Sequence, residues 1–209
     1  MFVTDDRIRC IVNYFENKPL TRTELNYKND YELLISVILS AQCTDRRVNE
    51  ISPGLFNVYC DFKDLSNANA SDVFELIKSV SYPVEKSRRI VNVSKVIHNE
   101  YNDVIPNDFE KLLKVNGIGR KTANLVLSIL YGYEGIAVDT HVTRVANRLG
   151  LVNSKNAKII ERELSYLFPR KYYNKINPWF VIFGRYQCKA IGPKCSNCGL
   201  KKICKNFEK

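Results

Sequence analysis

Four cysteines in the last part of the sequence have the spacing of a metal site. They are Cys188, Cys195, Cys198 and Cys204, in the pattern C-x6-C-x2-C-x5-C, with no histidine among them. Zinc sites built from four cysteines usually combine two short C-x2-4-C knuckles, and this stretch contains only one. A compact run of cysteines is more typical of a 4Fe–4S cluster, in which each iron takes one thiolate. The spacing therefore favours a 4Fe–4S cluster and leaves zinc as the alternative.

A second stretch, VNGIGRKTANLVL over residues 115–127, has the composition of a phosphate-binding turn. Gly117 and Gly119 precede an apolar run long enough for a buried helix, and Arg120 and Lys121 stand where that helix should begin. Cations at a helix N-terminus cost roughly 0.3–1 kcal/mol each. A bound phosphate would remove this cost, because the glycines let backbone N–H groups approach it and Arg120 then lies beside an anion. The stretch predicts a helix–hairpin–helix that binds a phosphate.

Lys121 and Asp139 each allow two interpretations. Beside a positive helix end and an arginine, the ammonium form of Lys121 is disfavoured, and a neutral amine is a nucleophile. Lys121 could instead be a second phosphate-binding lysine. Asp139 stands at the start of a predicted helix, where an aspartate is most often an N-cap, but it could also be a carboxylate that works with the amine. The local sequence decides neither case.

Positive charge is concentrated at one end of the chain. The net charge is +10, and the last 25 residues hold seven Lys and Arg against one acid, Glu208. Such a segment predicts a polyanionic partner, most often nucleic acid. The stretch MFVTDDRIRC has acidic residues where a targeting peptide would be basic and apolar, and no apolar stretch reaches the length of a membrane span. We therefore expect a cytoplasmic protein with reduced thiols, in which the isolated Cys10, Cys43 and Cys60 are buried small hydrophobes.

Apolar residues recur at helical spacing along most of the remaining chain, whereas strand alternation is scarce. The chain is therefore predicted to be all-α. The predicted helices are 31–41 with Asp30 as cap, 71–80 with Ser71 or Asp72 as cap, 87–101, 108–115, 139–151 with Asp139 as cap and Gly150 closing it, 157–168, and one that Thr44 or Asp45 begins.

These motifs together resemble the endonuclease III family of DNA glycosylases, in the helix–hairpin–helix superfamily, nearly end to end. The stretches ELLISVILSAQCTD, VNGIGRKTANLVL, IAVDTHVTRVANRLG and FGRYQC and the cysteine pattern occur in the family's order and spacing. The resemblance implies two helical domains flanking a DNA-binding cleft. One is a six-helix barrel over residues 22–133, with the helix–hairpin–helix at about 109–128. The other, residues 1–21 and 134–209, carries the 4Fe–4S cluster.

The resemblance also implies a reaction in base excision repair. A bifunctional enzyme flips a damaged base out of double-stranded DNA, and Lys121 attacks the sugar and displaces the base. Asp139, opposite Lys121 at the mouth of the cleft, stabilises positive charge on the sugar and assists proton transfer. The Schiff base then permits β-elimination, which cuts the strand 3′ to the abasic site. The expected substrates are DNA with oxidised pyrimidines or abasic sites, and the expected enzyme is a monomer associated with a bacterial nucleoid.

The resemblance assigns further residues to contacts with DNA. Gln42 matches the family residue that fills the hole left by the flipped base, and Lys189 and Lys194 match a basic loop that contacts phosphates. The family commonly has a Gly-Leu-Tyr stretch with a wedging leucine where this chain has SYP at 81–83, so Tyr82 is predicted to stack there instead. The proline predicts an extended backbone at Tyr82. Each of these side chains could instead be an ordinary polar or surface residue.

Two alternative functions remain open from the sequence. An adenine mismatch glycosylase of the same superfamily would lack the nucleophile that Lys121 supplies. A non-catalytic DNA-binding protein with a structural metal would share the glycine turn and the four cysteines. Only an amine nucleophile leaves an adduct on damaged DNA that borohydride traps, so trapping separates these functions from the first.

Overall fold

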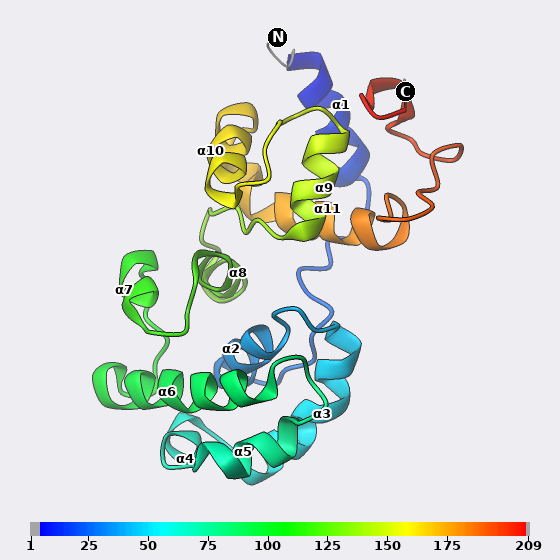
Figure 1. The fold of residues 1–209 in the computed structure, drawn as a ribbon. Helices are drawn as coiled ribbons and strands as arrows, with labels where there is room; N and C mark the ends of the chain where they lie inside the picture. Colours follow the sequence, from blue (N-terminus) through cyan, green and yellow to red (C-terminus); the bar gives the residue numbers. More distant parts are fainter. Residues whose placement is uncertain (1–4, 208–209) are drawn as a thin grey trace. The chain divides into compact units, whose positions relative to one another are not determined.

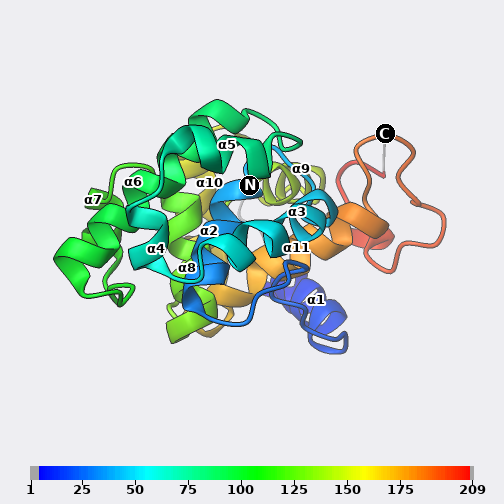
Figure 2. The same cartoon turned by 90° about the horizontal axis from the view of Figure 1, so that it is seen from below.

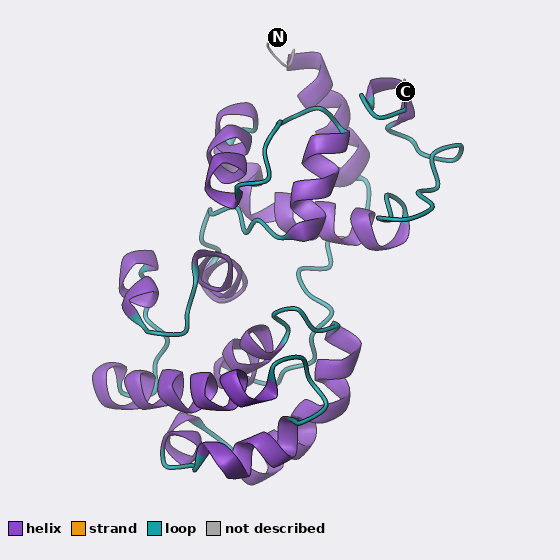
Figure 3. Ribbon diagram, in the orientation of Figure 1, coloured by secondary structure: helices purple, strands orange, loops and turns teal. Residues whose placement is uncertain are grey.

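The computed structural model describes residues 5–207, and the chain divides into two compact units (Figure 1). Residues 24–131 form one, here called the hairpin unit. Residues 1–23 and 132–209 form the other, here called the cysteine unit. All regular structure in the described residues is helical (Figure 3), which confirms the all-α prediction. Glu208 of the basic segment and the first four residues of MFVTDDRIRC lie outside the described residues.

The hairpin unit is organised around one buried helix. Its helices are α2 (Asp30–Leu39), α3 (Asp45–Val58), α4 (Phe62–Ser66), α5 (Ala70–Ile77), α6 (Pro83–Tyr101), α7 (Phe109–Lys114) and α8 (Arg120–Tyr131). Residues 31–39 of α2 are all buried, and α2 packs against α3, α6 and α8 (Figures 1 and 2). A helix that is apolar on every side needs such neighbours all round. Among residues 5–207, no helix has the length and apolar character needed to cross a bilayer.

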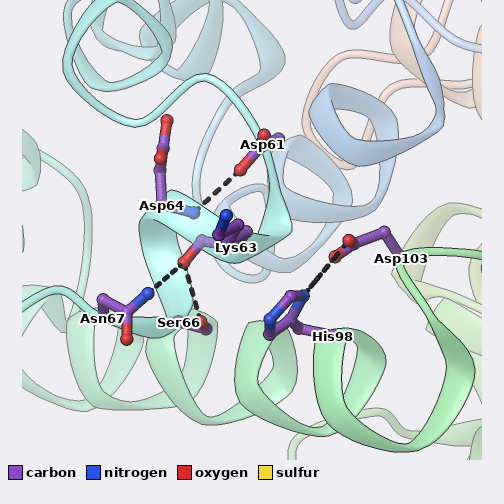
Figure 4. A network of polar contacts seen from close by, with 7 residues as sticks. All are labelled: Asp61, Lys63, Asp64, Ser66, Asn67, His98 and Asp103. Atoms are coloured by element: carbon purple, nitrogen blue, oxygen red, sulfur yellow. Dashed lines mark hydrogen bonds and ion pairs between the residues drawn. The ribbon is translucent and has the colours of Figure 1, made fainter.

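Side chains hold the ends of α4, a five-residue helix that the sequence did not predict (Figure 4). Asp61 Oδ1 accepts a hydrogen bond from the backbone N–H of Asp64 at 2.8 Å. Ser66 Oγ and Asn67 Nδ2 both donate to the carbonyl of Lys63, at 2.7 and 2.9 Å. These bonds satisfy backbone groups that so short a helix leaves unpaired, and they fix α4 where it packs along α6.

The end of α6 is also held by a side-chain contact. Asn102 and Asp103 both have left-handed backbone conformations, with φ of 50° and 62°, which turn the chain away from the helix axis. His98 Nδ1 lies 2.9 Å from Asp103 Oδ1 across this turn (Figure 4). The contact fixes the direction in which the chain leaves α6 toward α7.

An aromatic core joins the two sequence segments of the cysteine unit. Its helices are α1 (Asp5–Glu16), α9 (Thr140–Arg148), α10 (Ala157–Leu167) and α11 (Tyr173–Tyr186), with the short 3-10 helices η1 (Arg170–Tyr172) and η2 (Lys201–Ile203). Phe15 of α1 stacks on Trp179 of α11 with ring centroids 5.5 Å apart, and it meets Phe183 edge-on at the same distance. Aromatic pairs of this geometry add to the stabilisation from burial. The core therefore fixes α1 against a helix far along the chain.

Some helix ends are predicted correctly by the sequence. Thr44 Oγ1 accepts a hydrogen bond from the N–H of Arg47 at 3.2 Å and caps α3, and Asp139 caps α9. Gly150 closes α9 with φ of 69°. These predictions are confirmed because each depends on a residue type that suits one backbone position.

Two predicted caps are wrong. Helix α2 includes Asp30, and its N-cap is Asn29, whose side chain accepts a hydrogen bond from the helix. Helix α5 begins at Ala70 with Asn69 as N-cap, ahead of Ser71 and Asp72. At α2 the reason is that asparagine caps a helix as well as aspartate does, whereas the Asn69 side chain makes no capping bond to the backbone of α5, and Asn69 is its N-cap by backbone position alone. An aspartate just inside the first turn, such as Asp30 or Asp72, still gains from the helix dipole.

The isolated cysteines are more exposed than predicted. Cys10 and Cys60 are exposed, and Cys43 is half-buried. Cys10 lies on the outer face of the amphipathic α1, and Cys60 lies in the connection between α3 and α4. The prediction of three buried thiols is therefore wrong, because it used the general behaviour of cysteine without the face on which each one lies.

Candidate active site and metal centre

Helices α7 and α8 and the turn between them place four predicted site residues together. Val115 and Ile118 are buried and anchor the turn in the core of the hairpin unit. Gly117 has φ of 110°, and a Cβ atom there would lie 2.8 Å from Cγ of Arg89 and 3.0 Å from Cγ2 of Val93. A side chain at this position would therefore meet both a strained backbone and α6. Gly117 is required by the fold of the turn itself.

Gly119 differs from Gly117, because a Cβ atom there would meet no atom within 4 Å other than those of Gly119 itself and its two chain neighbours. The packing of the unit gives no reason for a glycine at this position, whereas the close approach of another molecule would. Arg120 begins α8, and its guanidinium carbon lies 4.9 Å from the ring centroid of Phe109 on α7. This cation–π contact orients the arginine at the positive end of a twelve-residue helix. Lys121 follows it and is exposed.

Asp139 follows a buried segment in the cysteine unit. Ile136, Ala137 and Val138 are buried, and Asn177 of α11 donates a hydrogen bond from Nδ2 to the carbonyl of Ala137 at 2.6 Å. Asp139 Oδ1 accepts a hydrogen bond from the N–H of Val142 at 2.8 Å. The carboxylate is half-buried, and this bond uses one of its two oxygens. The N-cap interpretation is confirmed, and the other oxygen leaves room for a second role.

Gln42 and Tyr82, both exposed, lie in turns with the same unusual backbone conformation. Their φ angles are 54° and 55°, in the left-handed region that side chains other than glycine rarely adopt. The predicted extended backbone at Tyr82 is wrong. Pro83 is the first residue of α6 and does disfavour the right-handed conformation before it, but the tight turn from α5 into α6 takes the left-handed alternative. Tyr82 is 59% exposed as a residue, in agreement with the stacking interpretation.

Two residues that the sequence analysis missed connect these turns. Ser81 Oγ donates to the carbonyl of Gln42 at 2.7 Å, and Lys86 Nζ donates to the carbonyl of Leu39 at 2.7 Å. Lys86 is only 3% exposed. Burial lowers its pKa, the nearby Cys43 opposes this, and the charge of Arg89 lowers it further. The sequence does contain a signal, because Lys86 falls one helical turn before Ile90 on the buried face of α6.

The four predicted metal ligands line a single hollow in the cysteine unit. It holds about 360 Å³ of empty space, counting the part open to solvent. The cysteines Cys188, Cys195, Cys198 and Cys204 line it together with apolar side chains and three cations, Arg148, Lys194 and Lys201. Within residues 5–207, no three His, Cys, Asp or Glu side chains lie close enough together to hold a single metal ion. The four sulfurs thus share a hollow without forming a closed single-ion site.

Two of the four sulfur atoms have a hydrogen-bond donor, whereas Cys204 Sγ itself donates to the carbonyl of Arg148 at 3.3 Å. Burial raises the pKa of the Cys198 thiol, a hydrogen bond from the backbone of Leu200 opposes this, and the other three cysteines raise it further. Arg148 Nη1 lies 3.5 Å from Cys188 Sγ. Four neighbouring thiolates repel one another, so their ionisation requires a cationic group between them. The all-sulfur donor set, with hydrogen-bond donors on Cys188 and Cys198, fits an iron–sulfur cluster.

Two arginines of α9, which the sequence analysis also missed, hold the loop between the first two cysteines. Arg148 donates to the carbonyl of Lys189 at 2.6 Å and to that of Ala190 at 3.0 Å. Arg144 donates to the carbonyls of Cys188 at 3.2 Å and Gly184 at 2.9 Å. These bonds fix the backbone of the loop.

The two predicted DNA-contacting lysines of this loop are both exposed. Lys189 lies at its start, and Lys194 lies at its end, where its N–H donates to the carbonyl of Gln187 at 3.0 Å. The loop is closed at this point, because Gln187 Nε2 donates back to the carbonyl of Lys194. A fixed loop therefore presents two cations to solvent.

Comparisons with known proteins agree with this arrangement. A model of the HhH-GPD superfamily of base excision DNA repair proteins matches residues 35–170. Endonuclease III of Rickettsia felis is 39% identical over 93% of this chain and 91% of its own length, and that of Bacillus subtilis is 36% identical over 96% and 92%. The structure of a trapped endonuclease III–DNA covalent intermediate, an estranged-adenine complex, is similar with a TM-score of 0.91 and 35% identity, over 99% of this chain and 98% of that one. The resemblance is confirmed: the chain belongs to the endonuclease III family of DNA glycosylase/AP lyases, within the HhH-GPD superfamily.

Proposed function

We propose that Lys121 is the amine that forms the covalent intermediate of this enzyme with DNA. The observation that carries the proposal is the exposed Lys121 in the first turn of α8, directly after a turn in which Gly119 leaves open space. An exposed amine at a positive helix end, beside a site that suits a phosphate, can reach the sugar of a bound nucleotide. The similar solved structure of a trapped endonuclease III–DNA covalent intermediate supports such an adduct here.

The proposed reaction has two stages. The Lys121 nitrogen attacks the anomeric carbon of a flipped nucleotide, the bond from that carbon to the base breaks, and the base leaves with a proton. The amine and the opened sugar then form a Schiff base, which acidifies the neighbouring sugar hydrogens. Loss of one of these protons expels the 3′ phosphate by β-elimination. We assign Asp139 to stabilising the positive charge on the sugar and to proton transfer, through the oxygen that its N-cap bond leaves available.

The proposed substrates are DNA with oxidised pyrimidines, such as thymine glycol, and DNA with abasic sites. Gly117, Gly119 and Arg120 bind a phosphate beside Lys121. Gln42 and Tyr82 occupy the gap that the flipped nucleotide leaves in the duplex.

Two exposed lysines extend the proposed interface in the cysteine unit. Lys189 and Lys194 contact phosphates from the fixed loop between Cys188 and Cys195. Such contacts add affinity without reading sequence.

The proposed cofactor is a 4Fe–4S cluster bound by Cys188, Cys195, Cys198 and Cys204. When bound, the cluster supplies a cationic core that permits four neighbouring thiolates. The chain supplies hydrogen bonds to the sulfurs and the cations Arg148, Lys194 and Lys201 around them. The support for this cofactor is the shared hollow and the all-sulfur donor set, in a family that generally carries such a cluster.

The domain assignment and the location belong to the same proposal. Residues 22–133 are assigned to the six-helix barrel domain, in which the short α4 is a seventh helix, and residues 1–21 and 134–209 to the iron–sulfur domain. We place the enzyme, as a monomer, with the nucleoid in a bacterial cytoplasm, which the bacterial origin of its relatives supports.

Borohydride trapping tests the nucleophile. The wild-type protein, incubated with a thymine-glycol duplex and borohydride, should form a stable protein–DNA adduct, and Lys121→Gln should form none while retaining most of its DNA affinity. Lys95→Gln, which removes an exposed lysine from α6, is the matched control and should trap like the wild type. An adduct of undiminished yield in Lys121→Gln would assign the nucleophile to another amine.

A further inference from the structure

The turns that hold Gln42 and Tyr82 are connected by two side chains with no role in the proposed chemistry. We propose that Ser81 and Lys86 are positioning residues, which hold these two turns together as one preformed element for the gap beside a flipped base. This inference rests on the proposed function, because it takes Gln42 and Tyr82 as the residues that enter the gap.

Lys86 fixes the helix end from which the Gln42 turn departs. Its amine reaches the carbonyl of Leu39, the last residue of α2, at 2.7 Å from a buried position. The C-terminal carbonyls of a helix carry partial negative charge and have no partners within the helix. A buried amine is costly unless it is hydrogen-bonded, so this contact resists being broken. The end of α2 is thereby tied to the first turn of α6, which begins directly after Tyr82.

Ser81 connects the two turns themselves. Its hydroxyl donates to the carbonyl of Gln42, and its own backbone is adjacent to Tyr82. Both Gln42 and Tyr82 have left-handed backbones, which persist only where surrounding contacts hold them. With its carbonyl held, Gln42 has a fixed backbone position from which its side chain departs. Because of this bond, the two turns can move only together.

A purely structural role for these bonds would have a different signature. If the bonds only stabilised the fold, removing Ser81 Oγ would have the same effect whether or not the Gln42 side chain is present. If they position Gln42, the effect should largely disappear once that side chain is gone. The Gln42→Ala variant keeps the carbonyl that Ser81 contacts, so a double-mutant cycle can separate the two cases.

The experiment is single-turnover excision of thymine glycol with enzyme in excess, for the wild type, Ser81→Ala, Gln42→Ala and the double variant. Ser81→Ala should slow excision about fivefold in the wild-type background, the effect of losing one hydrogen bond, and less than about twofold in the Gln42→Ala background. Ser165→Ala is the control, because it removes a serine-to-carbonyl bond of the same 2.7 Å length in α10 and should change nothing. Lys86→Met should slow excision in the same way, and if it does not fold, the Ser81 cycle alone decides.

The outcomes separate this inference from the proposed function. Equal effects of Ser81→Ala in both backgrounds would overturn positioning while leaving the role of Gln42 intact. Wild-type excision by Gln42→Ala would overturn both the role of Gln42 and the positioning. Neither result touches the assignment of Lys121, which the trapping experiment decides separately.

Discussion

The glycine turn of residues 115–121 and the cysteine segment of residues 188–207 are held in place by different means. The turn is anchored by buried Val115 and Ile118 and by the close approach of Gly117 to α6. In the cysteine segment, Leu200 is the one buried residue, and the short η2 is the only regular element. Polar bonds from arginines, together with the proposed cluster, take the place here that apolar packing has in the turn. Substitutions that remove the chemistry of the turn should therefore leave the protein folded. Substitution of a cysteine ligand should instead disorder the cysteine segment.

The largest expected effect is on the cysteine segment. Cys195→Ser should lose the cluster and the order of residues 188–207, because ligand binding there supplies the stability that a core does not, on the order of several kcal/mol. The wild type should contain about four iron atoms per chain and be yellow-brown. Iron content, protease sensitivity of the segment and DNA affinity measure the loss.

Cys60→Ser is the control for this prediction. Cys60 is exposed in the hairpin unit and outside the hollow, so its replacement should leave iron content and affinity unchanged. A Cys195→Ser protein with normal iron content and a protected segment would contradict the dependence on the cluster. If protein made under anaerobic, iron-replete conditions contained stoichiometric zinc, the four cysteines would be assigned to a zinc site in place of the cluster.

The two glycines of the turn should differ in their effect on stability. Gly117→Ala should lower the free energy of unfolding by about 2 kcal/mol or more, because its left-handed backbone and the contact with Arg89 both oppose a side chain. Gly119→Ala meets open space and should change the free energy of unfolding by less than about 0.5 kcal/mol, but it should weaken DNA binding. Urea unfolding and DNA titration of both variants make the measurement. Equal stability losses would mean that Gly119 also serves the fold.

Replacement of Tyr82 should affect excision more modestly. Tyr82→Ala should lower single-turnover excision of thymine glycol at least tenfold, a barrier change of about 1.4 kcal/mol, because the stacking surface is lost. Tyr82→Phe keeps the ring and should remain near the wild type. If the alanine variant is as fast as the tyrosine enzyme, another residue is the wedge.

The smallest effect at neutral pH concerns Tyr31 in the buried α2. Burial, with the charges of Asp61 and Asp64, raises the pKa of its phenol above the usual 10.0, and the hydroxyl donates to the carbonyl of Tyr59 at 2.8 Å. Above pH 10 the unfolded phenol ionises while the folded one stays protonated, so the free energy of unfolding falls as pH rises. The contribution is about 1.4 kcal/mol in total between pH 9 and 11, and its slope approaches about 1.4 kcal/mol per pH unit only above pH 11. In urea unfolding between pH 9 and 11, the free energy of unfolding of Tyr31→Phe should fall less steeply with pH than that of the wild type. Parallel pH dependences of the two proteins would contradict the raised pKa of Tyr31.

Sequence analysis predicted what depends on residues close together in the chain. The cap at Asp139, the closing glycine at 150 and the turn at 115–121 each follow from a local pattern, and so does the cysteine spacing. Exposure of Cys10 and Cys60 depends on which face or connection each occupies, and the left-handed backbone of Tyr82 depends on the turn between two helices. The bond from Ser81 to Gln42 joins residues far apart in sequence, so local patterns contain no trace of it.

Mapping the borohydride-trapped adduct determines whether Lys121 forms the covalent bond to DNA. Borohydride-reduced adduct from the wild-type protein, digested with protease and nuclease and sequenced by mass spectrometry, should carry the sugar remnant on the peptide containing Lys121, on its side-chain nitrogen. The assignment of Lys121 as the nucleophile requires this modification at one position and its absence from Lys121→Gln. A remnant on any other amine of the wild-type protein, with Lys121 unmodified, would contradict it.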